Sequence, residues 1–189
     1  MLFRKISYLQ FLLKSTNQHG IHSPFVYQFV TQGIYIKNNS EALAYLKKKA
    51  AYNKFSFQKV TLFYKIITYF NPEYIGVDPP SFSVYADIFQ QNHNTIAPFD
   101  PDSEQTYAML LFSDDINLPR AAFTKLIQSR NVTDHIVIIV EDLYENQKKI
   151  NLWKELLQQS LVSISIDFYY YGLLFLNRKQ AKEHFVIRT

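Results

Sequence analysis

The sequence predicts an α/β protein in which a helical N-terminal segment precedes a doubly wound, mostly parallel sheet with an antiparallel C-terminal edge. Three observations support this class. Apolar residues recur at helical spacing through the first third of the chain. From Glu73 onward, short apolar runs alternate with helical stretches, the order that builds a parallel sheet covered by helices. Near the end, three short strands follow one another with no room for helices between them.

The helices of the N-terminal segment are marked by spacing and by end signals. In HGIHSPFVYQFVTQG, Ser23 is a typical N-cap, Pro24 suits the first helical position and Gly33 suits the end. The pair Asn71-Pro72 ends the last of these helices. The predicted helices span residues 3–14, 24–32, 40–52 and 57–70.

The rest of the chain alternates strands with helices. The run IVIIV over residues 136–140 is typical of a parallel strand covered on both faces. The predicted strands are residues 74–77, a short one in NTIAPF, 107–112, 135–140, 162–167, 172–176 and 185–187. The predicted helices between them are residues 81–91, 118–130 and 145–159.

Composition limits the classes of protein that fit. A chain of 189 residues is long enough for one domain with a full core. We expect a single compact unit, with residues 1–55 as a helical segment packed on an α/β domain of residues 56–189. The absence of cysteine excludes disulfides, thiolate metal sites and a cysteine nucleophile, and it fits a cytoplasmic location. Only four glycines are present, too few for a typical glycine-rich phosphate loop.

Charge and hydropathy argue against two kinds of partner. No run approaches the roughly 18 apolar residues of a membrane span, and no signal-peptide cleavage site follows the N-terminal stretch, so we expect no membrane partner. The net charge of +4 comes from scattered basic residues, such as the lysines at 47–49 and 148–149. We interpret these as solvated faces, and nucleic-acid binding is unlikely on this ground.

Two stretches resemble a known family. The N-terminal HGIHSPFVYQFVTQG and the C-terminal ISIDFYYYGLLFLNRKQAKEHFVIRT are similar to the corresponding segments of a bacterial group of HSPF-motif methyltransferase-like proteins. That group belongs to the class I S-adenosylmethionine-dependent methyltransferases. The resemblance implies a Rossmann-like methyltransferase sheet, here truncated, with S-adenosylmethionine as cofactor and a small molecule as substrate.

The chain departs from the family where the cofactor should bind. The family's acidic position falls near Gly76, its first glycine near Asp78 and a later glycine near Phe82. Asp78 would set a carboxylate against the carboxylate of the cofactor, and Phe82 would fill space that the ligand needs. Pro79 and Pro80 remove two backbone N–H donors from the same turn.

The middle of the chain is also shorter than in the family. Between residues 91 and 107 the family fits strands and helices that include the acid holding the ribose hydroxyls. Here NHNTIAPFDPDSEQT has room for one short strand and a loop. We therefore expect the ribose-binding acid to be absent.

Acidic residues follow two further predicted strands. In LLFSDDIN, Asp114 matches the family's acid and Asp115 replaces its glycine, while Glu141 and Asp142 follow the next strand. These carboxylates suit Mg²⁺ or a catalytic base, but acids at strand ends are also common loop residues, which is the interpretation we favour, with no metal site. The residual cofactor cleft would contain the following side chains: Asp78, Ser81, Asp114 and Glu141.

Histidines and aromatic residues give weaker signals. His19 and His22 flank a turn, where they suit a structural hydrogen bond as well as catalysis, and His184 and Arg188 mark an edge or a partner surface. The aromatic run DFYYYG over residues 167–172 suits either an inter-subunit face or packing within a hairpin.

These observations leave two main hypotheses and do not decide whether the protein is an enzyme. The first is a methyltransferase-like fold that has lost S-adenosylmethionine binding and acts as a structural or interaction protein. Its partner would be a second copy of the chain, in a homodimer, or another protein, bound through the aromatic C-terminal strands. The alternative is an active methyltransferase with a rebuilt pocket in which Asp78, Asp114 or Glu141 contacts the cofactor. A basic nucleic-acid-binding module is the weakest reading, because its charges are scattered.

Overall fold

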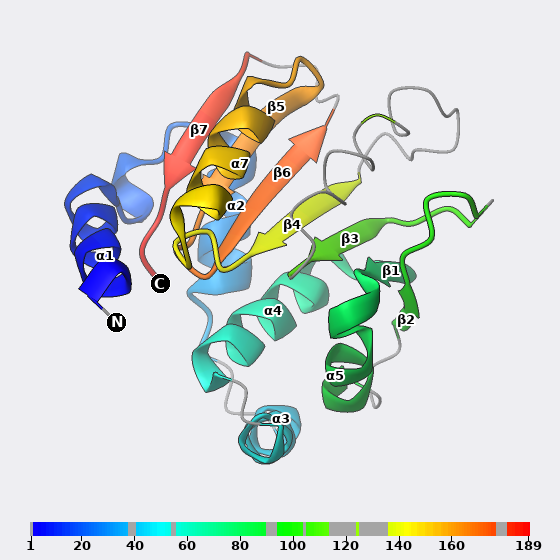
Figure 1. The fold of residues 1–189 in the computed structure, drawn as a ribbon. Coiled ribbons are helices and arrows are strands. Elements are labelled where there is room, and N and C mark those ends of the chain that lie inside the picture. Colours follow the sequence, from blue (N-terminus) through cyan, green and yellow to red (C-terminus); the bar gives the residue numbers. More distant parts are fainter. Residues whose placement is uncertain are drawn as a thin grey trace.

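The computed structural model describes residues 2–37, 41–53, 56–89, 94–103, 105–113, 124, 136–176 and 181–189. Within this part the protein is an α/β fold with one seven-stranded sheet (Figure 1). The helices are α1 (Leu2–Lys14), η1 (Gln18–Gly20), α2 (Pro24–Phe29), η2 (Val30–Ile34), α3 (Glu41–Tyr52), α4 (Phe57–Phe70), α5 (Pro79–Phe89) and α7 (Gln147–Gln158). The strands are β1 (Tyr74–Val77), β2 (Thr95–Pro98), β3 (Met109–Phe112), β4 (Val137–Glu141), β5 (Val162–Asp167), β6 (Tyr171–Leu176) and β7 (Glu183–Val186).

The predicted helix over residues 24–32 forms, but it ends differently. Ser23 occupies the N-cap position and Pro24 the first helical position, as expected. The helix then continues through Gly33 to Ile34 as a π-helical turn, η2. A Cβ atom on Gly33 would lie 2.9 Å from the ring of Tyr69. Glycine is therefore required here for close packing against α4, and the expectation that it terminates the helix is wrong.

The sheet confirms the predicted class. Its strand order is β2-β1-β3-β4-β6-β5-β7. The pairs β1/β2, β1/β3 and β3/β4 are parallel, whereas β6 runs antiparallel to both β4 and β5. The last strand, β7, lies parallel to β5 at the end of the sheet. The chain changes direction across the sheet between β1 and β3, and ligands of open α/β sheets bind at such a switch point.

The shortened middle has the structure that its length predicts. A single short strand, β2, pairs in parallel with β1 at the edge of the sheet. The described residues between β2 and β3 form turns and loop only. The predicted helix over residues 118–130 falls outside the described residues, apart from Thr124.

Apolar side chains form a cluster on each face of the sheet. One cluster joins α2, η2, α3, α4 and α5 to the sheet, and the other joins α7 to the opposite face. Neighbouring residues of β3 divide between them, because Met109 and Leu111 belong to the first cluster and Leu110 and Phe112 to the second. Figure 1 shows α7 and α2 on opposite sides of the sheet. Among the described residues, no helix is both long and apolar enough to cross a membrane.

The aromatic run after β5 packs inside the molecule. Phe168 and Tyr171 are buried. The ring of Tyr169 stacks on Tyr144 at 5.1 Å between centroids and meets Tyr8 of α1 edge-on at 4.9 Å. These aromatic side chains therefore pack within the molecule, as the hairpin alternative predicts. A homodimer through the C-terminal strands stays a prediction.

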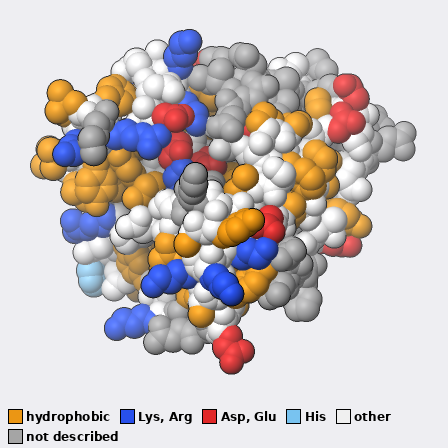
Figure 2. All heavy atoms as spheres, turned by 60° about the horizontal axis from the view of Figure 1, so that its bottom comes forward, with side chains coloured by type: hydrophobic (Ala, Val, Ile, Leu, Met, Phe, Trp, Pro, Cys, Tyr) orange, Lys and Arg blue, Asp and Glu red, His pale blue; other side chains and the backbone are white. Residues whose placement is uncertain are grey.

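Basic and apolar side chains share the surface of the molecule at α1. This helix lies beside β7 at one side of the molecule (Figure 1). On the same side, Figure 2 shows hydrophobic side chains gathered among lysine and arginine side chains. Several large apolar residues of α1 are exposed, including Leu2, Leu9 and Leu13.

Candidate functional site

The exit of β1 is filled by a side chain of the protein itself. Asp78 is the first residue after β1 and is fully buried. Its Oδ1 atom accepts the backbone N–H of Ser113 at 3.1 Å, and its Oδ2 atom lies 3.5 Å from the Ser81 hydroxyl. Its backbone carbonyl accepts the N–H groups of Ser81 and Phe82, which starts α5. Asp78 thus joins the exits of β1 and β3.

The helix that follows begins earlier than expected. We predicted a start at Ser81, but α5 begins at Pro79. Both prolines occupy the first turn, where a missing N–H costs no helical hydrogen bond. The same two positions would otherwise direct N–H groups at a bound anion, so this helix start is poor in donors. Phe82 packs against the apolar cluster that joins the N-terminal helices, α4 and α5 to the sheet.

Two hydrogen bonds hold the backbone of Ser113, the first residue after β3. The N–H of Ser113 binds Asp78, and its carbonyl accepts the Lys149 ammonium at 2.6 Å. The Lys149 ammonium also lies 3.0 Å from Glu145 Oε2 and 3.4 Å from the backbone carbonyl of Glu141. The predicted site residue Asp114, like its neighbour Asp115, lies outside the described residues.

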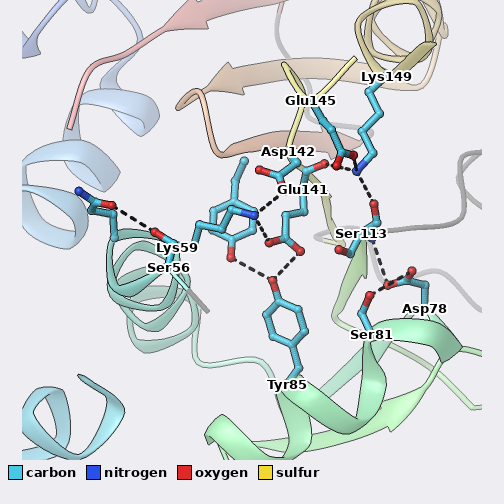
Figure 3. A network of polar contacts seen from close by, with 12 residues as sticks. Ser56, Lys59, Asp78, Ser81, Tyr85, Ser113, Glu141, Asp142, Glu145 and Lys149 are labelled. Carbon is cyan, nitrogen blue, oxygen red and sulfur yellow. Dashed lines mark hydrogen bonds and ion pairs between the residues drawn. The ribbon is translucent and has the colours of Figure 1, made fainter. Parts of the chain in front are cut away.

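The exit of β4 holds a second buried network, drawn in Figure 3. Glu141, the last residue of β4, is 1% exposed. Its Oε1 atom accepts Lys59 of α4 at 2.9 Å, and its Oε2 atom accepts the Tyr85 hydroxyl of α5 at 2.8 Å. The Tyr85 hydroxyl also lies 3.0 Å from that of Tyr171 in β6. The Lys59 ammonium in addition forms an ion pair with Asp142.

Burial and charge set the protonation of this network. Burial raises the pKa of Tyr85 well above its ordinary value, and the Glu141 charge adds to the effect. The pKa of Tyr171 is raised for the same two reasons. Burial lowers the pKa of Lys59, but the Glu141 and Asp142 carboxylates raise it by more in sum, so the net shift is upward. Both phenols therefore stay protonated and Lys59 stays charged at neutral pH.

The acids at the end of β4 face an ammonium group. The alternative of a Mg²⁺ site combined Glu141 and Asp142 with Asp114. The first two carboxylates form ion pairs with Lys59, and Asp114 lies outside the described residues. Within the described ranges, no group of three or more histidine, aspartate or glutamate residues could hold a metal ion. His19 and His22 are exposed, and the backbone N–H of His19 donates to the side chain of Asn17.

A polar cavity adjoins the Glu141 network. Its volume is about 450 Å³. Arg4 and Lys59 contribute positive charge, and Asp142 and Glu145 contribute negative charge. The cavity is lined by Arg4, Ser56, Lys59, Asp142, Tyr144, Glu145, Tyr169 and Tyr170. Mixed charge of this kind suits a small polar molecule and offers little apolar surface.

One acid near the switch point was not singled out in the sequence. Val77 of β1 pairs with Pro98 of β2, and Asp100 follows two residues after β2. Asp100 is exposed, and its Oδ1 atom accepts the N–H of Asp102 at 2.9 Å. The family's ribose-binding acid was expected to be absent because the middle is short. Asp100 stands beyond the carboxyl end of β2 and is exposed.

The sequence analysis also did not identify the lysine and tyrosine side chains that bind the buried acids. Lys149 was interpreted as part of a solvated face, but it is buried. Its position carried a signal, since Lys149, Leu152 and Leu156 recur at helical spacing along the buried face of α7. A lysine within an apolar stripe indicates a buried cation with a partner.

The two networks bring together some of the predicted site residues. Asp78 and Ser81 are in contact, and the backbone carbonyl of Glu141 is linked to them through Lys149 and Ser113. Neither a family model nor a curated protein matches this chain.

Proposed function

We propose that this protein is a non-catalytic structural or interaction protein on a methyltransferase-like scaffold, and that it does not bind S-adenosylmethionine. One observation carries the proposal. The Asp78 carboxylate occupies the exit of β1, fully buried and bound to the N–H of Ser113. In the family that the chain resembles, a glycine-rich turn leaves this place open to the cofactor.

The donors that a carboxylate ligand needs are missing or in use at this exit. Pro79 and Pro80 have no N–H. The N–H of Ser113 is bound to Asp78, and the first N–H groups of α5 bind the carbonyl of Asp78. Moving the Asp78 side chain away would leave the N–H of the partly buried Ser113 without this acceptor, at a cost of about 1 kcal/mol. The residues at this exit do not fit the carboxylate of the cofactor.

The second network supports the same proposal. Glu141 has one oxygen bound to Lys59 and the other to Tyr85. A base that abstracts a proton from a substrate must reach that proton directly or through one water. A carboxylate that is 1% exposed and bound at both oxygens is poorly placed for this task.

One observation favours the alternative, an active S-adenosylmethionine-dependent methyltransferase with a rebuilt pocket. Asp100 is exposed beyond the carboxyl end of β2, beside the switch point, where an acid could hold ribose hydroxyls. The 450 Å³ polar cavity at the end of β4 would then receive the substrate.

Titration of the full chain with S-adenosylmethionine and S-adenosylhomocysteine tests the proposal. We expect no saturable heat up to millimolar ligand and no shift in melting temperature. Binding with a Kd near 10 μM would instead add about 2.7 kcal/mol at 1 mM ligand. That gain would raise the melting temperature by about 5–10 °C, and the proposal would be wrong.

Two variants test whether binding of S-adenosylmethionine depends on Asp100 or is prevented by the charge of Asp78. Asp100→Ala would abolish binding if this acid holds the ribose, and it would change nothing if the heat has another source. Asp78→Asn keeps an oxygen for the Ser113 N–H and removes the charge. If the variant alone binds S-adenosylmethionine, the Asp78 charge is what excludes the cofactor from the natural chain.

A further inference from the structure

Helix α1 is attached to the molecule by one face only. Phe11 is 3% exposed and packs against Tyr169 at 5.4 Å and Tyr144 at 6.2 Å between ring centroids. Ser7, one turn earlier, is also buried. Tyr169 donates its hydroxyl to the carbonyl of Arg4. These contacts fix which face of α1 points to solvent.

The opposite face of α1 is an exposed aliphatic stripe. Leu2, Ile6, Leu9 and Leu13 are separated by four, three and four residues, so they lie in one line along the helix. Their exposed fractions are 73%, 47%, 61% and 87%. A contiguous exposed stripe of this kind is typical of a contact surface, because leaving one large aliphatic side chain in water forfeits about 1.5–3 kcal/mol.

The charge around the stripe indicates what covers it. At 100° per residue, Lys5 lies about 70° from the centre of the stripe on one side, and Lys14 lies about 110° from it on the other. The charge of Lys14 also opposes the rise that burial gives to the pKa of the Asp167 carboxyl group, so this ammonium at the end of α1 acts on the body of the protein as well. The sequence of α1, LFRKISYLQFLLK, contains no acidic residue. The guanidinium of Arg4 pairs with Glu145 at 3.2 Å, which leaves Lys5 and Lys14 as the cations beside the stripe. The occupant should therefore be apolar at its centre and anionic at its margin.

We propose that α1 docks in the plane of a lipid surface that carries anionic headgroups. The aliphatic stripe would enter the boundary between headgroups and acyl chains, and the flanking lysines would meet the phosphate and carboxylate groups. A helix of 13 residues is about 20 Å long, too short to span a bilayer, and surface docking requires no span. The proposal therefore departs from the expectation of no membrane partner, which considered only a membrane span and a signal peptide. This inference depends on α1 alone and is independent of the proposed function.

A second copy of the chain suits the stripe less well. Pairing α1 with itself would bring lysines together without any acid on either helix. One helix face about 20 Å long also offers only a part of the roughly 800 Å² that each partner buries in a standard interface. Charge and area therefore both favour the lipid surface.

Sedimentation with vesicles tests the proposal on the full chain. We expect binding to vesicles of phosphatidylcholine with 30% phosphatidylserine, and much weaker binding to phosphatidylcholine alone or at 0.5 M salt. Lys5→Gln with Lys14→Gln should weaken binding about 25-fold, since each lysine near the surface is worth about fivefold. Leu9→Ser with Leu13→Ser should weaken it about 100-fold.

Controls separate docking from unfolding and from dimer formation. Gln10→Ser, on the same helix, should leave binding unchanged, and all variants should keep the melting temperature because the changed side chains are exposed. Equal binding to both vesicle types, or no binding, overturns the proposal. It is also overturned if light scattering finds a wild-type dimer that the leucine variant converts to a monomer.

Discussion

At the scale of single residues, the buried carboxyl groups are the most informative feature of this protein. Among the described residues, Asp78, Glu141 and Asp167 are buried carboxyl groups. Each is held by donors from elsewhere in the fold, since an unpaired buried charge would cost several kcal/mol. The donors are Ser113 N–H for Asp78, Lys59 and Tyr85 for Glu141, and Tyr144 and Tyr169 for Asp167. The acids themselves were visible in the sequence, but their donors were not.

Asp167 gives a prediction on pH. Burial raises its pKa from 3.8 to about 6, although hydrogen bonds from Tyr144 and Tyr169 oppose the shift. The native state therefore holds this proton more tightly than the unfolded state, so the free energy of unfolding falls as pH rises from 4 to 6. Relative to wild type, Asp167→Asn should gain about 2–3 kcal/mol between pH 4 and pH 7. Urea unfolding of both proteins across this range measures the difference.

Tyr144 supplies a control for this titration. Its hydroxyl donates to Asp167, and this bond lowers the pKa of the carboxyl group. Tyr144→Phe should therefore raise the native pKa of Asp167 further and extend the fall in stability to higher pH, while the fall still begins near pH 4. A constant difference between Asp167→Asn and wild type from pH 4 to pH 7 would contradict the assignment.

At the scale of elements, the Glu141 network ties four of them together. It joins α4 through Lys59, α5 through Tyr85 and β4 through Glu141 (Figure 3). The contact of Tyr85 with Tyr171 adds β6. These elements meet at the end of the sheet where parallel strands direct their carboxyl termini. The network thus fixes the helices over the edge that would otherwise form a ligand cleft.

Removing the cation from this network should destabilise the protein strongly. Lys59→Met leaves Glu141 buried without its charge partner, and we expect a loss of about 3–5 kcal/mol in the free energy of unfolding. The double variant with Glu141→Gln should recover about 1–3 kcal/mol of that loss. Urea unfolding of the complete cycle measures the coupling. The exposed Lys154→Met is the matched control, expected within 0.5 kcal/mol of wild type, and additive losses would rule out a coupled pair.

The predicted bounds of helices and strands match the structure where the signals in the sequence are local. The helix over residues 57–70 and the strands over residues 74–77 and 162–167 match the predicted ranges. The helix through Gly33 does not, because that glycine is required by a ring of α4 and not by a helix end. A glycine or proline marks the end of a helix reliably only where no distant side chain packs against that residue.

At the scale of the whole molecule, the N-terminal elements α2, η2 and α3 share one apolar cluster with the sheet. Val26, Phe29 and Leu46 belong to the same buried cluster as Phe63 and Ile75. This packing agrees with a single compact unit, although the boundary predicted at residue 55 stays a prediction.

Truncation tests that boundary. A chain that begins at residue 56 would expose the side of α4 and the sheet that the N-terminal helices cover, and we expect it to lose cooperative unfolding. The full chain should unfold in one transition, coincident by far-ultraviolet and near-ultraviolet circular dichroism. A cooperative transition of the shortened chain at the same urea midpoint would show instead that residues 56–189 are an independent domain.

The sequence by itself determined the α/β class, the length of most elements, the short middle and the donor-poor turn after β1, because these depend on periodicity and on residue types within one turn. Tertiary structure alone decided which side chains complete each acid and which face of α1 stays exposed. Asp78 and Ser113 are 35 residues apart and Lys59 and Glu141 are 82 apart. Periodicity reports that a helix has an apolar face, but only packing against distant residues decides whether that face is covered.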